Sequence, residues 1–72
     1  MPKLPSISGW EAAHAFERAG WTVARQRGSA VLIKAGSIYT LSIPLHDNLG
    51  PGLLRDQIRK AGLTVDEFIA LL

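Results

Sequence analysis

A short stretch near the middle of the chain, residues 25–30 (RQRGSA), combines residue types that bind phosphate. Arg25 and Arg27 supply guanidinium groups, and the Gly-Ser pair after them predicts a tight turn with free backbone N–H groups, so both kinds of donor can face one anion. A bound phosphate is half of a phosphodiesterase site, because cleavage also needs a group that transfers a proton. The position after the Gly-Ser pair holds Ala30, whose methyl group transfers none. The stretch therefore predicts an anion-binding turn from which the reactive group is missing.

The length and composition suit one small domain. The chain has 72 residues, no cysteine and a formal net charge of +2, and we expect residues 1–72 to form a single domain that buries about 60% of its unfolded surface. The absence of cysteine excludes a disulfide framework and a thiolate nucleophile. No apolar run approaches the ~18 residues of a membrane span, and the proline-broken start is too short for a signal peptide. We therefore expect a cytoplasmic protein that does not enter a membrane.

The charges are distributed unevenly along the chain. No Asp or Glu lies between Glu17 and Asp47, although several cations do, and a second basic group near the C-terminal end is diluted by Asp56. Such asymmetry suits a polyanion or an acidic protein partner. A solvated face of a small stable domain is the alternative that charge alone leaves open. The cations of the first group are Arg18, Arg25, Arg27 and Lys34, and those of the second are Arg55, Arg59 and Lys60.

A capping box marks the start of the first helix. Ser8 and Glu11 have the S-x-x-E spacing in which the hydroxyl and the carboxylate each accept from the other residue's backbone N–H. Apolar residues follow at helical spacing, and Gly20 is placed to take the left-handed conformation that ends a helix. The pattern predicts a helix from residue 9 to about residue 19.

Three antiparallel strands are expected to follow. Residues 22–26 and 30–34 are rich in β-forming residues, and the three residues between them are typical of a hairpin turn. Residues 38–43 alternate between apolar and polar side chains, and Pro44 closes this strand. Tyr39, Leu41 and Ile43 are expected to face the core, as are Val31 and Ile33, whereas Ala30, Leu32 and Lys34 are expected on the open side of the sheet.

Two further helices complete the predicted fold. Pro51 suits the first turn of a helix that Gly62 ends. A second capping box from Thr64 to Glu67 predicts a short last helix that runs to Leu72. The order predicts an α+β fold, a two-layer α-β-β-β-α sandwich with a short extra C-terminal helix. Helices cover one face of the sheet and leave the other face to a partner.

Five short motifs occur in an order and spacing that resemble one known family. They are residues 19–21 (AGW), 25–29 (RQRGS), 43–46 (IPLH), 52–63 (GLLRDQIRKAGL) and 66–68 (DEF). No motif is decisive by itself, but together they resemble the HicA toxins, small RNA-cleaving proteins (mRNA interferases). The resemblance covers nearly the whole chain, and it implies a fold like that of double-stranded-RNA-binding domains.

The resemblance implies RNA cleavage without a metal or cofactor, by a catalytic histidine at the position of Ala30. An imidazole suits this role because its pKa near 6.5 lets it take or give a proton at neutral pH, and losing it typically costs about 10² to 10⁴ in rate. The chain is therefore predicted to be almost inactive. Ala30 is either a natural loss or a deliberate substitution that allows a growth-inhibiting protein to be produced. We favour the second because Arg25, Arg27 and Gly28, which suit a working phosphate site, are all retained.

Five other residues have both a functional and a simpler interpretation. His46 stands where the family pattern also has a histidine, and it is either a second proton-transfer or RNA-contacting group or a loop residue that bonds the start of the next helix. His14 is expected to be an ordinary exposed helix residue, and neither histidine has partners for a metal site. Ser29 has no histidine–carboxylate pair to activate it, so it should cap the turn or bind phosphate. Trp10 and Trp21 could stack on bases, but packing at the core edge is favoured.

The resemblance also implies a partner, a HicB-type antitoxin that covers the toxin's site in a hetero-oligomer. We predict the toxin component of a type II toxin–antitoxin system, an endoribonuclease inactivated at Ala30. A non-catalytic RNA-binding module of the same fold and a pure protein-interaction domain are the alternatives. The candidates for RNA binding are Arg25, Arg27, Gly28, Ser29, Lys34, His46, Arg55, Arg59 and Lys60, and those for antitoxin binding are Arg25, Arg27, Ala30, Leu32 and Lys34.

Overall fold

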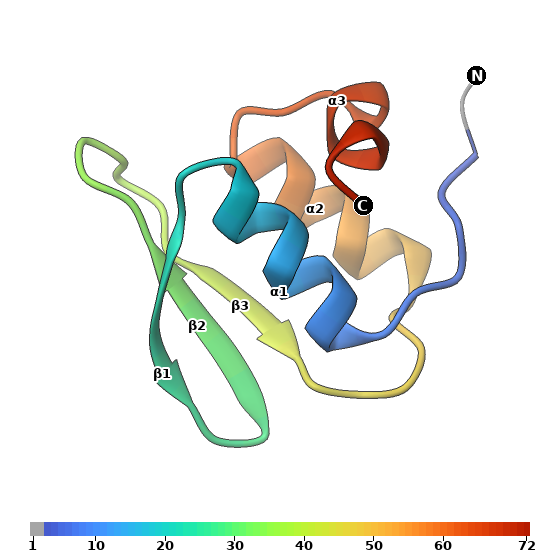
Figure 1. Ribbon diagram of the computed structural model, residues 1–72, viewed down its shortest axis with the longest axis horizontal. Helices are drawn as coiled ribbons and strands as arrows, with labels where there is room; N and C mark the ends of the chain where they lie inside the picture. Colours follow the sequence, from blue (N-terminus) through green and yellow to red (C-terminus); the bar gives the residue numbers. More distant parts are fainter. Residues whose placement is uncertain (1–2) are drawn as a thin grey trace.

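The computed structural model describes residues 3–72 and has the predicted α+β architecture. A three-stranded antiparallel sheet of order β1-β2-β3 forms one layer, and three helices gather on one side of it as the second layer (Figure 1). Within residues 3–72, no helix is long and apolar enough to span a membrane. In chain order the elements are α1 (Gly9–Arg18), β1 (Thr22–Gln26), β2 (Ser29–Ile33), β3 (Leu41–Pro44), α2 (Pro51–Lys60) and α3 (Val65–Ala70).

Both predicted capping boxes are confirmed. The Ser8 hydroxyl accepts from the Glu11 N–H at 3.2 Å, and the Glu11 carboxylate accepts from the Ser8 N–H at 3.1 Å. Thr64 and Glu67 make the same pair of bonds at 3.1 and 2.9 Å. Gly20 follows α1 with a φ of +99°, the left-handed conformation expected after a helix. The sequence thus determines where α1 and α3 begin and where α1 ends.

The core lies between the sheet and the helices. Phe16 of α1 and Phe68 of α3 are both fully buried, and their ring centroids lie 5.0 Å apart. The Arg18 guanidinium donates to the carbonyl oxygen of Leu71 at 2.7 Å, which fastens the C-terminal turn to α1. Trp21 is only 4% exposed and belongs to the same core, so the packing interpretation is confirmed for this tryptophan.

The predicted faces of β2 are wrong. Ala30 and Leu32 are fully buried against the helices, whereas Ile33 is 48% exposed. The reason is the register with β3, in which Ala30 lies opposite Ile43 and Leu32 opposite Leu41. Directly opposite residues share a face, and a shift of one residue exchanges the two faces. Because both alternating sets of β2 are apolar, its own pattern could not choose between them. The open face of β2 is formed by Val31 and Ile33.

The third strand is shorter than predicted. It begins at Leu41, because a turn centred on Ser37 occupies the preceding residues: the Ser37 N–H donates to the Lys34 carbonyl at 3.1 Å, and the Ser37 hydroxyl accepts from the Tyr39 N–H at 3.1 Å. Ile38 is 91% exposed. Tyr39 is half exposed and lies outside the strand, so the expectation that it faces the core is wrong.

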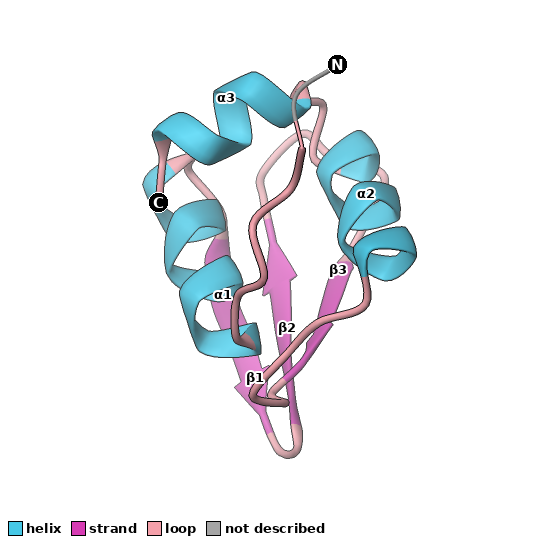
Figure 2. Cartoon of the chain, turned by 90° about the vertical axis from the view of Figure 1, so that its right-hand side faces the viewer, coloured by secondary structure: helices cyan, strands magenta, loops and turns pink. Residues whose placement is uncertain are grey.

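The two edges of the sheet have different surroundings. At the β3 edge, α2 lies beside the strand (Figure 2). The buried Gln57 of α2 accepts a hydrogen bond from the backbone N–H of Ser42 through its side-chain oxygen, at 3.1 Å. The β1 edge, by contrast, lies at the outside of the molecule, and most of its residues are exposed (Figure 1).

Candidate nucleic-acid interface

The hairpin between β1 and β2 presents two free guanidinium groups. Arg25 is exposed near the end of β1 and lies opposite Val31, which places it on the open face. Arg27 is exposed in the turn, where its backbone N–H donates to the Ser29 carbonyl at 3.0 Å and leaves the side chain free of this contact. No ion pair to either arginine occurs in the part of the chain that the structure describes. Both side chains can therefore bind an external anion.

Gly28 fixes the shape of the turn and leaves space around it. Its φ of +68° suits glycine, and a side chain built there would meet nothing within 4 Å. The carbonyl of Gly28 accepts a hydrogen bond from the Leu45 N–H at 2.9 Å. The carbonyl of His46, which follows Leu45, accepts one from the Gly9 N–H at 2.9 Å. The hairpin turn, the segment after β3 and the start of α1 are thus joined by backbone hydrogen bonds. We call this region the hairpin end.

Gly9 is a residue of this region that sequence reasoning missed. A Cβ atom at position 9 would lie 2.0 Å from the carbonyl oxygen of Pro44, so only glycine lets α1 approach the segment after β3 this closely. A signal was present, since a glycine directly after the N-cap Ser8 has no advantage for helix formation. Gly9 therefore positions His46 beside the turn.

Position 30 lies beneath the hairpin end rather than on its surface. Ala30 is the first β2 residue after Ser29 and is fully buried, opposite Gln26 of β1 and Ile43 of β3. It belongs to the helix-covered face, whereas Arg25 lies on the open face. The position that the resemblance makes catalytic and Arg25 are therefore on opposite sides of the sheet.

The two histidines have different settings. His46 is exposed at the hairpin end, close to the turn. His14 is exposed on α1, where its ring nitrogen lies 3.1 Å from a carboxylate oxygen of Glu17 and its ring stacks on Trp10 at a centroid distance of 5.8 Å. Trp10 is 39% exposed, so the packing interpretation does not hold for it as it does for Trp21. Among residues 3–72, no group of three or more metal-ligating side chains is present.

The remaining predicted cations lie away from the hairpin end. Lys34 follows β2 at the other end of the sheet, where its ammonium donates to the Ala19 carbonyl at 3.4 Å. Together with Lys60 it lines a cavity of about 300 Å³. These two lysines form a separate basic site near the C-terminal end of α2.

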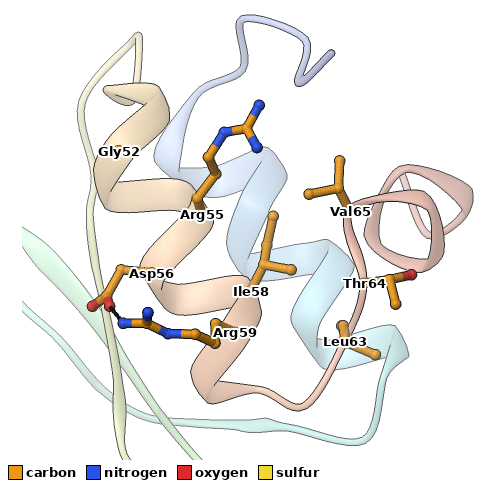
Figure 3. Close-up of a pocket in the computed structure, with 8 residues that line it drawn as sticks. All are labelled: Gly52, Arg55, Asp56, Ile58, Arg59, Leu63, Thr64 and Val65. Atoms are coloured by element: carbon orange, nitrogen blue, oxygen red, sulfur yellow. Dashed lines mark hydrogen bonds and ion pairs between the residues drawn. The ribbon is translucent and has the colours of Figure 1, made fainter. Parts of the chain in front are cut away.

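Two arginines of α2 line a larger cavity between α2 and α3, of about 490 Å³ (Figure 3). Arg59 forms an ion pair with Asp56, and Figure 3 shows Arg55 turned away from this pair. Lys60 also contacts Asp56, at 3.1 Å. The hydrogen bond from Lys60, with a smaller contribution from Arg59, holds the pKa of Asp56 below its usual value. Part of this positive charge is therefore neutralised within α2.

A family model described as HicA toxin of bacterial toxin–antitoxin systems matches residues 9–63. No curated protein and no solved structure matches the chain significantly. The matched region contains all three strands, α2 and the whole hairpin end. Because the match spans most of the 72 residues and the element order is the one that the sequence predicted, the chain belongs to the HicA toxin family.

Proposed function

We propose that this protein is the toxin component of a type II toxin–antitoxin pair and that its hairpin end binds the RNA backbone. The observation that carries the proposal is the pair of exposed arginines, Arg25 and Arg27, which lack an acidic partner in the described chain and flank an open glycine turn. Guanidinium groups and turn N–H groups are suited to phosphate. His46 brings an imidazole close to this turn, because the N–H of the preceding residue, Leu45, donates to the Gly28 carbonyl. Toxin, RNA and antitoxin would meet in the cytoplasm.

We further propose that the chain binds RNA but does not cleave it. Family activity would require a proton-transfer group at position 30, and a buried methyl group cannot serve as one. The second candidate is a non-catalytic RNA-binding module in which Ala30 is the native residue. The burial of Ala30 favours this candidate, because a small side chain fits the helix-covered face without strain.

The Ala30→His variant separates the two candidates. An endoribonuclease lacking only its imidazole should regain RNA cleavage in the presence of EDTA and arrest growth when expressed alone. The larger side chain should cost about 1–3 kcal/mol in stability through overpacking, so the fold of the variant must be verified. Ala30→Asn is the matched control, because it adds a polar side chain at the same buried position but no group that transfers a proton. Intact RNA from a folded Ala30→His variant between about pH 6 and 8, where an imidazole changes charge, would favour the non-catalytic module.

The partner in this proposal is a HicB-type antitoxin that masks the hairpin end. The prediction that Leu32 supplies the apolar centre of that contact is wrong, because Leu32 is fully buried. Val31 and Ile33, on the open face beside Arg25, are the apolar side chains that a partner can reach. Positive charge around an apolar centre is suited to an acidic partner with an apolar contact surface.

A further inference from the structure

The β3 edge of the sheet is closed to a further strand. The outward N–H of Ser42 is already bonded to the side chain of Gln57, at 3.1 Å, and Pro44 has no N–H to offer. The helix α2 lies along this edge. These are ways in which proteins protect an edge strand from pairing with another chain.

The β1 edge has free backbone groups. Backbone groups of an antiparallel strand point alternately towards its neighbour and away from it. The Arg27 N–H donates across the hairpin to Ser29, at 3.0 Å, so the adjacent Gln26 directs its N–H and C=O away from β2. The same alternation directs the groups of Val23 outward on the other side of the bulge at residue 24. Gln26 and Val23 thus offer donors and acceptors to a fourth strand.

The charge at this edge identifies the kind of strand that it suits. Arg25 and Arg27 flank Gln26, and no acidic residue lies between Glu17 and Asp47. A second copy of β1 would bring arginines opposite arginines, and like charges in such pairs destabilise a sheet. An acidic strand would instead place carboxylates beside both guanidinium groups.

We propose that the β1 edge binds an extended acidic segment of the antitoxin as a fourth strand of the sheet. This inference rests on the proposed function, which supplies the antitoxin as partner. Arg25 lies on the open face and Val23 on the helix side, so the added strand should alternate acidic and apolar side chains. Such a strand would lie directly beside the arginines of the hairpin end. The chain would therefore not bind the antitoxin strand and RNA at the same time.

The first test uses the whole chain, labelled with ¹⁵N, and a synthetic peptide of alternating Glu and Val. A Lys-Val peptide of equal length is the control. Strand addition predicts chemical-shift changes concentrated in residues 22–27 and slower amide exchange at Gln26 and Val23, from the Glu-Val peptide only. An absence of changes at millimolar peptide, equal effects of both peptides, or changes centred on the cavity between α2 and α3 would overturn the proposal.

A backbone variant separates this edge from the RNA site. Gln26→Pro removes an outward N–H without removing a bond of the β1–β2 ladder, and it should weaken peptide binding by about five- to tenfold. RNA binding through the arginine side chains should change by no more than about twofold. If the proline variant does not fold, a chemically synthesised chain with an N-methyl group on Gln26 makes the same change. If the folded Gln26→Pro variant binds the peptide as tightly as the parent chain, strand addition is refuted. If the parent chain forms a dimer and this variant does not, the edge instead pairs with a second copy of the chain. If the parent chain binds the peptide but does not bind RNA, only the proposed RNA-binding function is refuted.

Discussion

The two faces of the sheet differ in burial, although alternating residues of the same short strands form both. On the helix-covered face, Ala30 and Leu32 are fully buried together with their β3 neighbours. On the open face, Val31 and Ile33 alternate with them and lie beside Arg25. Because both sets of β2 residues are apolar, hydrophobicity does not distinguish the face that builds the core from the face that a partner can reach. Burial and register make that distinction.

This difference changes the interpretation of position 30. A residue on the open face could be replaced with little effect on the fold, but Ala30 is fully buried in the core, so a larger side chain there should affect stability. The arginines of the hairpin end have no such structural duty, since they are exposed and make no ion pair among the described residues. Mutations on the two faces should therefore separate stability from binding.

The largest expected effect is on the covered face. Leu32→Ala should lower the free energy of unfolding by about 2–5 kcal/mol, because it removes a fully buried side chain and leaves a cavity. Ile33→Ala is the matched control on the open face and should cost about 1 kcal/mol or less. Urea unfolding of both variants measures the difference. Equal losses would mean that the register of β2 with β3 is not the one described here.

A smaller effect is expected where α1 contacts the hairpin end. Gly9→Ala should lower the free energy of unfolding by about 1–3 kcal/mol, because the added methyl group meets the Pro44 carbonyl and α1 must move. Gly52→Ala places the same methyl group in open space within α2 and should be neutral or stabilise by up to about 1 kcal/mol. Thermal unfolding of the pair tests whether close approach, and not helix propensity, is what requires Gly9.

The smallest effect concerns Asp56, which lies on α2 and not on either face of the sheet. Its pKa is held below the usual value of 3.8, chiefly by the hydrogen bond from Lys60. Because the pKa of Asp56 is lower in the folded state than in the unfolded state, its ionised carboxylate stabilises the folded state at pH values above the unfolded-state pKa. This stabilisation is lost as the pH falls through the folded-state pKa. Asp56→Asn should therefore unfold at a slightly lower temperature than the parent chain near neutral pH, and the two should converge below about pH 3. A constant difference across this range would argue against an ionic cause.

Local signals in the sequence were sufficient to predict the elements. The capping boxes at Ser8 and Thr64, the glycine after α1 and the proline at the start of α2 each act within one turn of a helix, and each has the predicted role. The hairpin at Gly28 was predicted for the same reason, since its turn residues are contiguous. The two arginines and the Gly-Ser pair identified the basic turn as the candidate site, and the family resemblance then implied a catalytic role for position 30.

Features that depend on contacts between distant segments could not be predicted in this way. The face of β2 is set by its register with β3, and the requirement for Gly9 is set by the Pro44 carbonyl. The third strand begins later than predicted because a side-chain turn at Ser37 competes with strand pairing. Gln57 gave a partial signal, because a polar residue stands on the apolar stripe of α2, but its partner Ser42 is known only from the fold.

RNA binding by the hairpin end is tested most directly by the salt dependence of RNA binding by the chain itself. Each lost phosphate contact should reduce the slope of log K against log salt by about one, so Arg25→Ala combined with Arg27→Ala should reduce it by about two and weaken binding at every salt concentration. Arg55→Ala combined with Arg59→Ala removes the same charge from α2 and should leave the slope nearly unchanged. Equal reductions in both double variants, or an unchanged slope in the first, would contradict the assignment of RNA binding to the hairpin end.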